Sequence, residues 1–417
     1  MSIGYACLAI GVPGSGMKNC LLKNATEENL MSLIGQNLEA LNVLIDYNVR
    51  QGIRLFRISS DLIPFGSSVA MNLPWPIVYE DVLRRIGEKI ALSGMRVSMH
   101  PGQYTVINSP DPDVARRAAA DLEYHASVLD ALGIGVDHKI ILHAGGVYGD
   151  KVSAKQRFLE RFHNLAPGVR CRLVLENDDK LFHIEDILEL SVSAGLPVVF
   201  DNLHHAVNPP EKLASETEWI DRCAQTWKQE DGRQKLHYSQ PNPDKRPSAH
   251  SATISIAPFL RFFHDLDGRD VDIMLEVKDK NVSALKCIHC VEERGIGVLE
   301  ADWGRYKYAV LERAPDIYLG IRRLLKDKRS YPALEMYRLL EDALAKTPAA
   351  GNAINAAEHV WGYVRDKVTA AEKSRFRKRL QAYAAGDVLL TSVKKNLLTL
   401  SEKYGQDYLL SGYYFDF

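Results

Sequence analysis

The chain has 417 residues, of which 46% are hydrophobic and 25% charged, as is typical of a soluble globular protein. This length suffices for one barrel-sized domain and a smaller second domain. The net charge of -1 means that the chain as a whole does not attract nucleic acid electrostatically. A polyanionic partner would therefore have to contact a local basic surface.

Eight short apolar runs along the chain predict β-strands. They are Ile3–Ile10, Arg54–Ser59, Arg96–His100, Lys139–His143, Arg172–Glu176, Pro197–Asp201, Lys235–His237 and Val271–Glu276. Nearly continuous apolar runs are typical of parallel strands that are buried on both faces.

Helical patterns lie between these runs. Thr26 is expected to cap a helix whose apolar residues recur at helical spacing from Leu30 to Ile45. Asp111 and Pro112 predict the cap and the first residue of another helix, which Gly133 would end. Strands that alternate with helices indicate parallel βαβ units, so we predict an α/β fold, the TIM (β/α)₈ barrel.

The pattern changes near residue 325, where a charged stretch precedes Tyr331 and Pro332. Beyond it the chain is expected to be all-helical, with helices at Ala333–Ala345, Ala353–Lys367, Ala370–Ala385 and Leu390–Tyr404. We therefore predict a barrel domain over residues 1–325 and a C-terminal helical domain over residues 330–417.

Targeting signals and disulfide patterns are not apparent. The chain shows no apolar run that could span a membrane, and its start lacks the basic region of a signal peptide. The six cysteines include a lone Cys-x-x-Cys, Cys287 to Cys290, which without a second pair favours ordinary thiols over a zinc site. We expect a cytoplasmic protein in a reducing compartment, with no membrane partner.

The ends of the apolar runs carry residues that could bind metal ions. In a (β/α)₈ barrel the C-terminal ends of all strands meet on one face, where active sites form. The residues are His100, His143, Glu176, Asp201, His204, His237 and Glu276. A carboxylate after a buried run is costly unless paired or metal-bound, and neutral imidazole suits divalent transition metals. Each could singly be structural, but together they predict one polynuclear metal site.

Lys235 precedes His237 by two residues and should face the same way, because side chains alternate along a strand. Divalent cations would repel its ammonium group. Its pKa would therefore fall, or the amine would be carboxylated to an anionic carbamate that could bridge metals. A lysine that swings outward is the alternative that the sequence leaves open.

Further polar residues flank the predicted site. His250 follows a proline-rich polar loop that contains Lys245 and Arg246, and Lys278 and Lys280 follow the last predicted strand. From the sequence alone, the cations could contact phosphate groups or form a solvated surface.

Six ordered motifs within residues 1–320 resemble those of the UV damage endonuclease family. The motifs are His100-Pro101-Gly102-Gln103-Tyr104, Leu142-His143-x-Gly145-Gly146-x-Tyr148-Gly149, Leu175-Glu176-Asn177-Asp178-Asp179, Asp201-x-Leu203-His204-His205-Ala206-x-Asn208-Pro209, Lys235-x-His237 and Lys245-Arg246-Pro247-x-Ala249-His250. The resemblance implies a TIM barrel related to endonuclease IV and xylose isomerase. It also implies ATP-independent nicking of DNA immediately 5′ of UV photoproducts (pyrimidine dimers and 6-4 products) and some other lesions.

The resemblance further implies up to three divalent ions, most often Mn²⁺, with Zn²⁺, Co²⁺ and Mg²⁺ as alternatives. The first ion would take His100, His143 and Glu176. The second would share Glu176 and add Asp201, His250 and Glu276. The third would take His204 and His237, with carboxylated Lys235 nearby. Among these residues, Glu176, Lys235 and Glu276 are the implied catalytic residues.

DNA contacts are implied in the same way. Gln103 and Tyr104 match the pair that the family inserts into the duplex at the lesion, where an exposed aromatic ring can fill the gap left by extruded bases. A hydrogen-bonded loop beside the metals is the alternative reading. Tyr5 matches a position that lines the pocket for flipped nucleotides, although Ala9 departs from the polar residue expected nearby. The further implied contacts are Lys245, Arg246 and Lys278.

The C-terminal part resembles a YbgA-type helical domain, which has no function that we can assign. The matching residues are Asn352-x-x-Asn355-x-x-x-His359-x-x-Gly362-Tyr363, with Tyr404 and Tyr408-Leu409-Leu410 downstream. Binding of DNA, of another partner or of nothing is left open for this domain.

These observations together predict a metal-dependent DNA repair endonuclease that acts as a monomer on damaged double-stranded DNA, with no protein partner that can be inferred. A sugar isomerase or epimerase of the xylose isomerase type is one alternative, because that barrel also carries His and carboxylate metal sites. A non-catalytic protein that binds damaged DNA is another. Overlapping activity on abasic sites also stays open.

Overall fold

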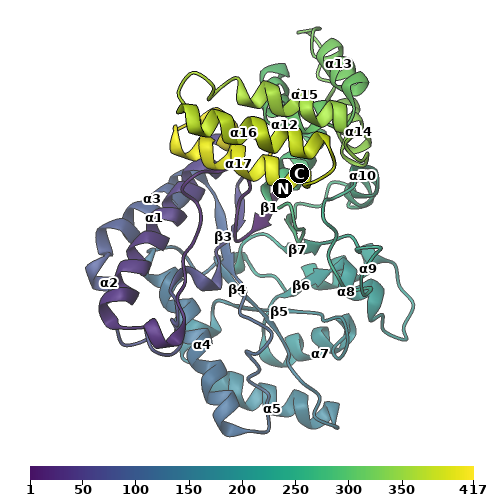
Figure 1. Ribbon diagram of the computed structural model, residues 1–417. Coiled ribbons are helices and arrows are strands. Elements are labelled where there is room, and N and C mark those ends of the chain that lie inside the picture. The colour runs from purple at the N-terminus through teal and green to yellow at the C-terminus, as the bar shows by residue number, and fades with distance from the viewer. The chain divides into compact units, whose positions relative to one another are not determined.

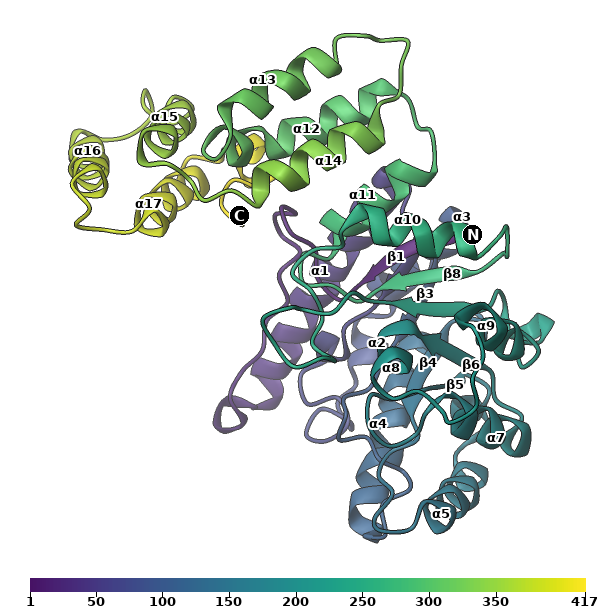
Figure 2. The ribbon, with the colours of Figure 1, turned by 90° about the vertical axis from the view of Figure 1, so that its right-hand side faces the viewer.

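The computed structural model describes every residue from Met1 to Phe417, which form two compact units (Figures 1 and 2). Unit 1 consists of Met1–Ala9, Gly14–Ile254 and Arg261–Leu285, and unit 2 consists of Ile10–Pro13, Ser255–Leu260 and Lys286–Phe417. The predicted domain boundary near residue 325 falls within unit 2 and stays a prediction.

Unit 1 is built on a closed barrel of eight parallel strands, in which β1 pairs with both β2 and β8 (Figure 2). The strands are β1 (Ser2–Ala6), β2 (Leu55–Arg57), β3 (Arg96–Met99), β4 (Lys139–His143), β5 (Leu173–Glu176), β6 (Val198–Asp201), β7 (Lys235–Tyr238) and β8 (Asp272–Leu275). Each predicted run overlaps one strand, and the predicted TIM barrel is confirmed.

Helices follow the strands and surround the barrel in Figure 1. They are α1 (Glu27–Gln51), α2 (Trp75–Val78), α3 (Glu80–Ser93), α4 (Pro112–Ala131), α5 (Lys151–Asn164), α6 (Pro167–Arg170), α7 (Ile184–Ala194), α8 (Asn202–Val207) and α9 (Glu216–Ala224). Two further helices, α10 (Ile256–Asp265) and α11 (Asn281–Val291), each belong partly to unit 1 and partly to unit 2. Single 3₁₀ turns lie at Leu22–Asn24, Ser60–Leu62 and Gln229–Asp231.

Two predicted helix caps are confirmed. The Thr26 side chain accepts a hydrogen bond from the Asn29 amide at the start of α1, and Asp111 accepts one from the Asp113 amide before α4. Each cap satisfies an amide that the first helical turn leaves unpaired.

The strands are buried on both faces, as their apolar sequences predict. Ile140 and Val199 are both completely inaccessible to solvent. Gly4 allows β1 to approach β2 closely, because a Cβ atom there would lie 1.9 Å from the Leu55 carbonyl oxygen. Packing of this density fixes the strand positions, and therefore the positions of the side chains at their C-terminal ends.

Buried ion pairs close the N-terminal end of the barrel. Arg96 at the start of β3 lies 2.5 Å from Asp272 at the start of β8, and Lys139 at the start of β4 lies 2.5 Å from Asp231. The charges of these side chains therefore neutralise one another within the barrel.

Unit 2 is helical, which confirms the predicted all-helical C-terminal region. Its helices are α12 (Ile296–Leu311), α13 (Pro315–Leu324), α14 (Ala333–Leu344), α15 (Ala350–Trp361), α16 (Ala370–Ala384), α17 (Leu390–Lys403) and α18 (Asp407–Leu410). α12 packs against α13, α14 and α15, and α15 in turn packs against α16 and α17 (Figure 2).

The predicted helix Ala353–Lys367 is wrong at both ends, since α15 begins at Ala350 and ends at Trp361. Val364 continues the apolar periodicity, but it is buried from a turn rather than from a helix. Trp361 stacks on Phe376 of α16, with ring centroids 4.2 Å apart. None of the helices in either unit combines the length and apolar character that a membrane span needs.

Candidate metal centre

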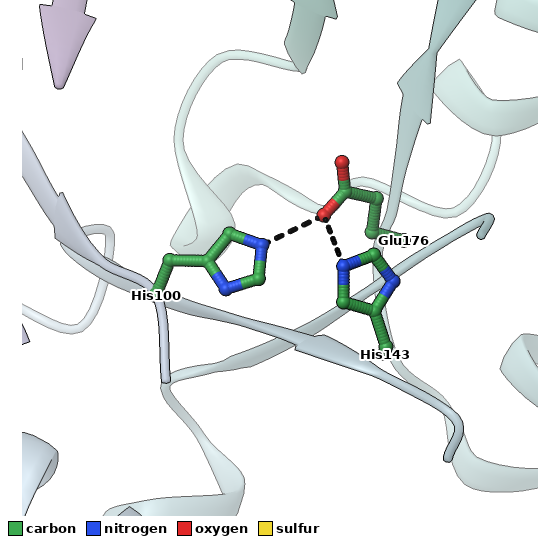
Figure 3. Close-up of side chains that lie close together, drawn as sticks. All are labelled: His100, His143 and Glu176. Carbon is green, nitrogen blue, oxygen red and sulfur yellow. Dashed lines mark hydrogen bonds and ion pairs between the residues drawn. The ribbon is translucent and has the colours of Figure 1, made fainter. Parts of the chain in front are cut away.

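The carboxylate of Glu176, fully buried at the end of β5, is the central group of the site (Figure 3). Its Oε2 atom lies 2.9 Å from Nε2 of His100 and 3.5 Å from Nε2 of His143. Its Oε1 atom lies 2.6 Å from Nδ1 of His237 in β7. The C-terminal ends of β3, β4, β5 and β7 therefore meet at one carboxylate.

Asp201 brings the end of β6 to the same cluster. Its Oδ1 atom accepts a hydrogen bond of 2.7 Å from the His204 amide, and the His204 ring lies 3.7 Å from Oε1 of Glu176. Asn177 holds the Asp201 backbone from both sides, since its amide oxygen accepts from the Asp201 N–H and its amide nitrogen donates to the Asp201 carbonyl. The position of Asp201 is thus fixed by the chain itself.

Glu276, directly after β8, brings the end of this strand to the same cluster. Its Oε1 atom lies 3.5 Å from Nδ1 of His237, and its Oε2 atom lies 3.5 Å from Nε2 of His250. Arg57 at the end of β2 places Nη2 2.5 Å from Glu276 and 2.9 Å from Nε2 of His237. Sequence reasoning missed Arg57, although a charged residue after Leu55 and Phe56 is the same signal that marked Glu176.

The seven residues predicted to converge at strand ends do lie together, and they form three overlapping groups. The ligand atoms of each group lie within 4.8 Å of one another: His100, His143 and Glu176; Glu176, Asp201 and His204; and Glu176, His237 and Glu276. The first group matches the one that the resemblance implies. The other two differ from it, because His204 pairs with Asp201 and His237 with Glu276. Each group could hold a metal ion.

Burial and mutual contact shift the pKa values of these groups in opposite directions. Burial alone would raise the pKa of Glu176, but His237 and His143 hold it well below its usual range. Burial raises the pKa of Asp201 to about 7. Burial opposes charge on His204, yet Asp201 and Glu176 raise its pKa to about 9. Near neutral pH, Asp201 and His204 therefore hold protons that a cation would displace.

The donor set fits a divalent metal ion. Oδ2 of Asp201 and Nδ1 of His143 are buried without a hydrogen-bond partner, whereas buried polar atoms normally have one. Imidazole nitrogen and carboxylate oxygen together suit Mn²⁺, Zn²⁺ and Co²⁺. A cation at Glu176 would also neutralise carboxylates that the barrel otherwise buries at a cost.

Lys235 is buried in β7, and its Nζ atom has no hydrogen-bond partner. Burial and the charge of Arg96 hold its pKa well below its usual range, and Arg57 and Lys139 act in the same direction. No hydrogen bond or ion pair joins it to the seven clustered residues. Its predicted role in metal binding stays a prediction.

A cavity of about 540 Å³ opens over the cluster. Its lining includes His100, His204 and Glu276 from the cluster, together with Gln103 and Arg246 from the loops. His250 and Tyr148 line it as well, whereas Lys245 and Lys278 are exposed outside it. The clustered groups are therefore open to a ligand through this cavity.

Tyr104 follows Gln103 and is 70% exposed, unlike most aromatic residues of the chain. Gly102 makes room for its ring, because a Cβ atom on Gly102 would lie 2.4 Å from the Tyr104 Cε1 atom. An exposed ring held beside the cavity can contact a macromolecule that approaches the cluster.

Tyr5 lies away from the cavity. It is completely buried in β1, donates a hydrogen bond of 2.8 Å to Asn48, and packs its ring edge-on against Phe56. It does not line the cavity. Its predicted contact with a lesion stays a prediction.

The fold and the cluster define this chain as a (β/α)₈-barrel protein with a candidate multinuclear metal centre at the C-terminal ends of the strands. Comparison with known proteins is consistent with that class. A family model described as UV-endonuclease UvdE matches residues 4–299, and the chain belongs to this family. A second model, of a protein family of unknown function (DUF1722), matches residues 307–417.

Individual relatives support the same conclusion. The chain is 36% identical over 404 residues to a UV DNA damage endonuclease of Clostridium perfringens, covering 95% of this chain and 97% of the relative. A UV DNA damage endonuclease of Bacillus cereus (strain G9842) is 32% identical over 270 residues, covering 64% of this chain and 84% of the relative. The crystal structure of SacUVDE matches with a TM-score of 0.67 at 37% identity, covering 70% of this chain and 98% of that one.

Family membership decides among the three functional classes that the sequence left open. The chain is an endonuclease of a DNA repair family, and its substrate is DNA. The isomerase and the non-catalytic binding protein are therefore set aside.

Proposed function

We propose that the chain nicks damaged double-stranded DNA immediately 5′ of UV photoproducts, in a reaction that requires divalent ions at the Glu176 cluster and no ATP. The observation that carries this proposal is the Glu176 carboxylate, which is buried against three imidazoles at the base of an open cavity. Such a cluster is costly to bury without a ligand and suits the phosphodiester chemistry of the family.

The residues of each group would hold the ions. His100, His143 and Glu176 would bind one ion, and Asp201 and His204 would bind a second with Glu176 shared between them. When bound, divalent ions activate the phosphodiester as Lewis acids and lower the pKa of a coordinated water molecule. The proposed metal is Mn²⁺, with Zn²⁺, Co²⁺ and Mg²⁺ as alternatives.

The third group has additional support. His237 and Glu276 share Glu176 with the other groups, and His250 contacts Glu276 from the loop. Arg57 orients Glu276 through their ion pair, and Asn177 orients Asp201 through the paired backbone hydrogen bonds. These two residues thus position carboxylates, while Glu176 and Glu276 would serve directly in catalysis.

Lys235 is proposed to be carboxylated and to act as the third catalytic residue. Burial among cationic side chains favours the neutral amine, which is the form that reacts with CO₂. The product is an anion, which the nearby guanidinium groups of Arg96 and Arg57 would stabilise.

DNA would reach the cluster through the cavity. Gln103 lines it and Tyr104 is exposed beside it, so the pair can enter the duplex where a lesion weakens base stacking. Arg246 lines the same cavity, and Lys245 and Lys278 are exposed, so all three are proposed to bind backbone phosphates. We propose that the protein acts as a monomer.

Nicking of a defined duplex tests this function. One strand carries a single cyclobutane dimer and an end label, and the metal-stripped protein is supplied with Mn²⁺ or with chelator. A product that ends immediately 5′ of the dimer, formed only with metal and without ATP, is expected. Cleavage that ignores the dimer, or that persists in chelator, would contradict the proposal. A parallel duplex with one abasic site measures overlapping activity on that lesion.

A further inference from the structure

Unit 2 exposes a cluster of aromatic rings around one lysine, here named the tyrosine platform: Lys307, Tyr308, Tyr363 and Tyr408. Lys307 and Tyr308 lie on α12, Tyr363 follows α15, and Tyr408 lies in α18. The rings of Tyr363 and Tyr408 stack with centroids 5.6 Å apart at an angle of 22°. The hydroxyl oxygens of Tyr308 and Tyr363 lie 2.9 Å apart. The platform therefore brings together Tyr363 and Tyr408, two residues of the C-terminal motif to which the proposed nicking reaction assigns no role.

The stacked pair is open to solvent. Tyr363 is 37% exposed and Tyr408 is 45% exposed, whereas Tyr337 and Tyr413 of the same unit are completely buried. The Tyr408 hydroxyl donates to the Gly304 carbonyl, which fixes the ring on the surface. The two rings are held in place and each is more than a third exposed, so they offer an area on which a flat apolar group can stack.

Lys307 adds a positive charge to the platform. Its Nζ atom lies 4.7 Å from the centroid of the Tyr308 ring and 4.9 Å from that of Tyr408, and no ion pair joins it to a carboxylate. Residues 286–417 also contain more Lys and Arg than Asp and Glu, whereas residues 1–285 contain fewer. The platform thus combines stacking surface with an unneutralised cation, which favours an anionic ligand with aromatic rings.

We propose that the tyrosine platform binds an unpaired nucleotide of DNA. The base stacks on the exposed rings of Tyr363 and Tyr408, and the backbone phosphate pairs with Lys307. Aromatic rings interleaved with cations are how proteins bind single strands without sequence preference. The proposal rests on the DNA substrate of the family, and it assigns unit 2 a DNA-binding role that is independent of nicking.

Binding of an oligothymidylate of about 12 nucleotides to the full-length, metal-free protein tests the stacking step. Fluorescence anisotropy should show that Tyr363→Ala and Tyr408→Ala each weaken binding by about tenfold, which corresponds to about 1.4 kcal/mol. Tyr363→Phe and Tyr408→Phe keep the ring and should bind within about twofold of the wild type. Leu389→Ala removes a more exposed apolar side chain from the same unit and should have no effect.

The salt dependence of oligothymidylate binding tests the role of the Lys307 charge. Lys307→Gln should lower the slope of log K against log salt by about 0.7, the value for one phosphate contact with a single strand. Lys395→Gln removes an exposed lysine of the same unit and should leave the slope unchanged. Equal slopes for Lys307→Gln and the wild type would overturn the phosphate contact.

Two probes separate base stacking from general attraction to a polyanion. An oligomer of the same length that lacks bases should bind at least about tenfold more weakly. Photocrosslinking of a 5-iododeoxyuridine strand should label the peptides that contain Tyr363 or Tyr408. Tight binding of the base-free strand, or crosslinks confined to peptides of unit 1, would overturn the proposal.

The outcome can be distinguished from failure of the proposed nicking function. Glu176→Gln alters the metal centre and should leave oligothymidylate binding unchanged. The platform variants should keep wild-type melting temperatures and should still nick a short duplex that carries one photoproduct. Loss of single-strand binding with intact nicking would support the platform, and intact binding in all platform variants would exclude it.

Discussion

Oε1 of Glu176 lies 2.6 Å from Nδ1 of His237, and both side chains are buried although 61 residues separate them in the chain. The other oxygen of this carboxylate lies 2.9 Å from Nε2 of His100. One side chain thus contacts imidazoles from β3 and β7, which lie on different sides of the barrel. Because Glu176 and His237 lie in strands and His100 directly follows β3, the barrel itself preorganises the site.

Replacing either central carboxylate should abolish nicking. Glu176→Gln and Glu276→Gln each keep the side-chain shape but remove a negative charge from a group that would hold cations. Metal analysis should show lower occupancy, with the greater loss in Glu176→Gln because this residue belongs to all three groups. Glu123→Gln, on the exposed face of α4, is the control. Full occupancy together with wild-type nicking in Glu176→Gln would refute its assignment.

Removing Arg57 should destabilise the metal-free protein. Arg57→Met leaves Glu276 buried without its cation, and breaking such a pair costs about 3–5 kcal/mol. Burial opposes the charge on Glu276, and Arg57 holds its pKa below the usual range. This stability is therefore present above the unfolded pKa of about 4.3 and is lost as the pH falls through the folded pKa.

Urea denaturation measures this effect. The difference between Arg57→Met and the wild type should be largest near neutral pH and should shrink under acidic conditions, and added metal should also reduce it. Arg54→Met removes an exposed arginine next to the same strand and should change stability little. A pH-independent difference would contradict the electrostatic account.

Metal affinity should tighten as the pH rises. Asp201, with a pKa of about 7, and His204, with a pKa of about 9, must lose protons before they bind a cation. Below these values each displaced proton changes the affinity about tenfold per pH unit, so Mn²⁺ should bind more than tenfold tighter at pH 8 than at pH 6. Calorimetry in buffers of different ionisation enthalpy should detect the released protons. Equal affinity at both pH values would rule out proton competition.

Tyr104→Ala should keep the metals and weaken discrimination between damaged and intact duplex. The ring is exposed beside the cavity and makes no contact with the clustered ligands, so its loss leaves them in place. Stacking of an aromatic ring on a base is worth about 1–3 kcal/mol, so the ratio of affinities for the two duplexes should fall about tenfold. Tyr104→Phe should retain most of the discrimination. Unchanged affinity and rate on one defined photoproduct would remove Tyr104 from this role.

Lys235 should be carboxylated in the folded protein. The amine is buried, and its pKa lies well below the usual value of about 10.4, so the neutral form that reacts with CO₂ is available. Carbamates are acid-labile, so low pH should reduce activity, and bicarbonate with metal at mildly alkaline pH should restore it. Carbon-13 bicarbonate should add one carbamate resonance. Electron density that ends at an unmodified Lys235 Nζ in an active preparation would contradict the carboxylation.

Much of the barrel and its site could be predicted from local patterns. The eight apolar runs predict the strands because a strand buried on both faces must be apolar throughout. A polar residue ends seven of the eight runs and marks the C-terminal end of the strand, and the topology of a parallel barrel brings those ends together. The convergence of His100, Glu176 and Glu276 therefore follows from sequence and topology, while the catalytic and metal-binding roles of these residues stay predictions.

Tertiary structure decided the contacts between different strands of the site. Burial and side-chain direction depend on packing between strands distant in sequence, which no local pattern encodes. Tyr5 is therefore buried against Phe56, and Arg57 turns toward Glu276. The grouping of His237 with Glu276 has the same origin, because interatomic distances across a barrel depend on strand register. His204 groups with Asp201 through a local contact instead, since Asp201 caps α8 and the two residues are three positions apart. Sequence thus determined which chemical groups reach this end of the barrel, and the packed barrel determined which of them touch.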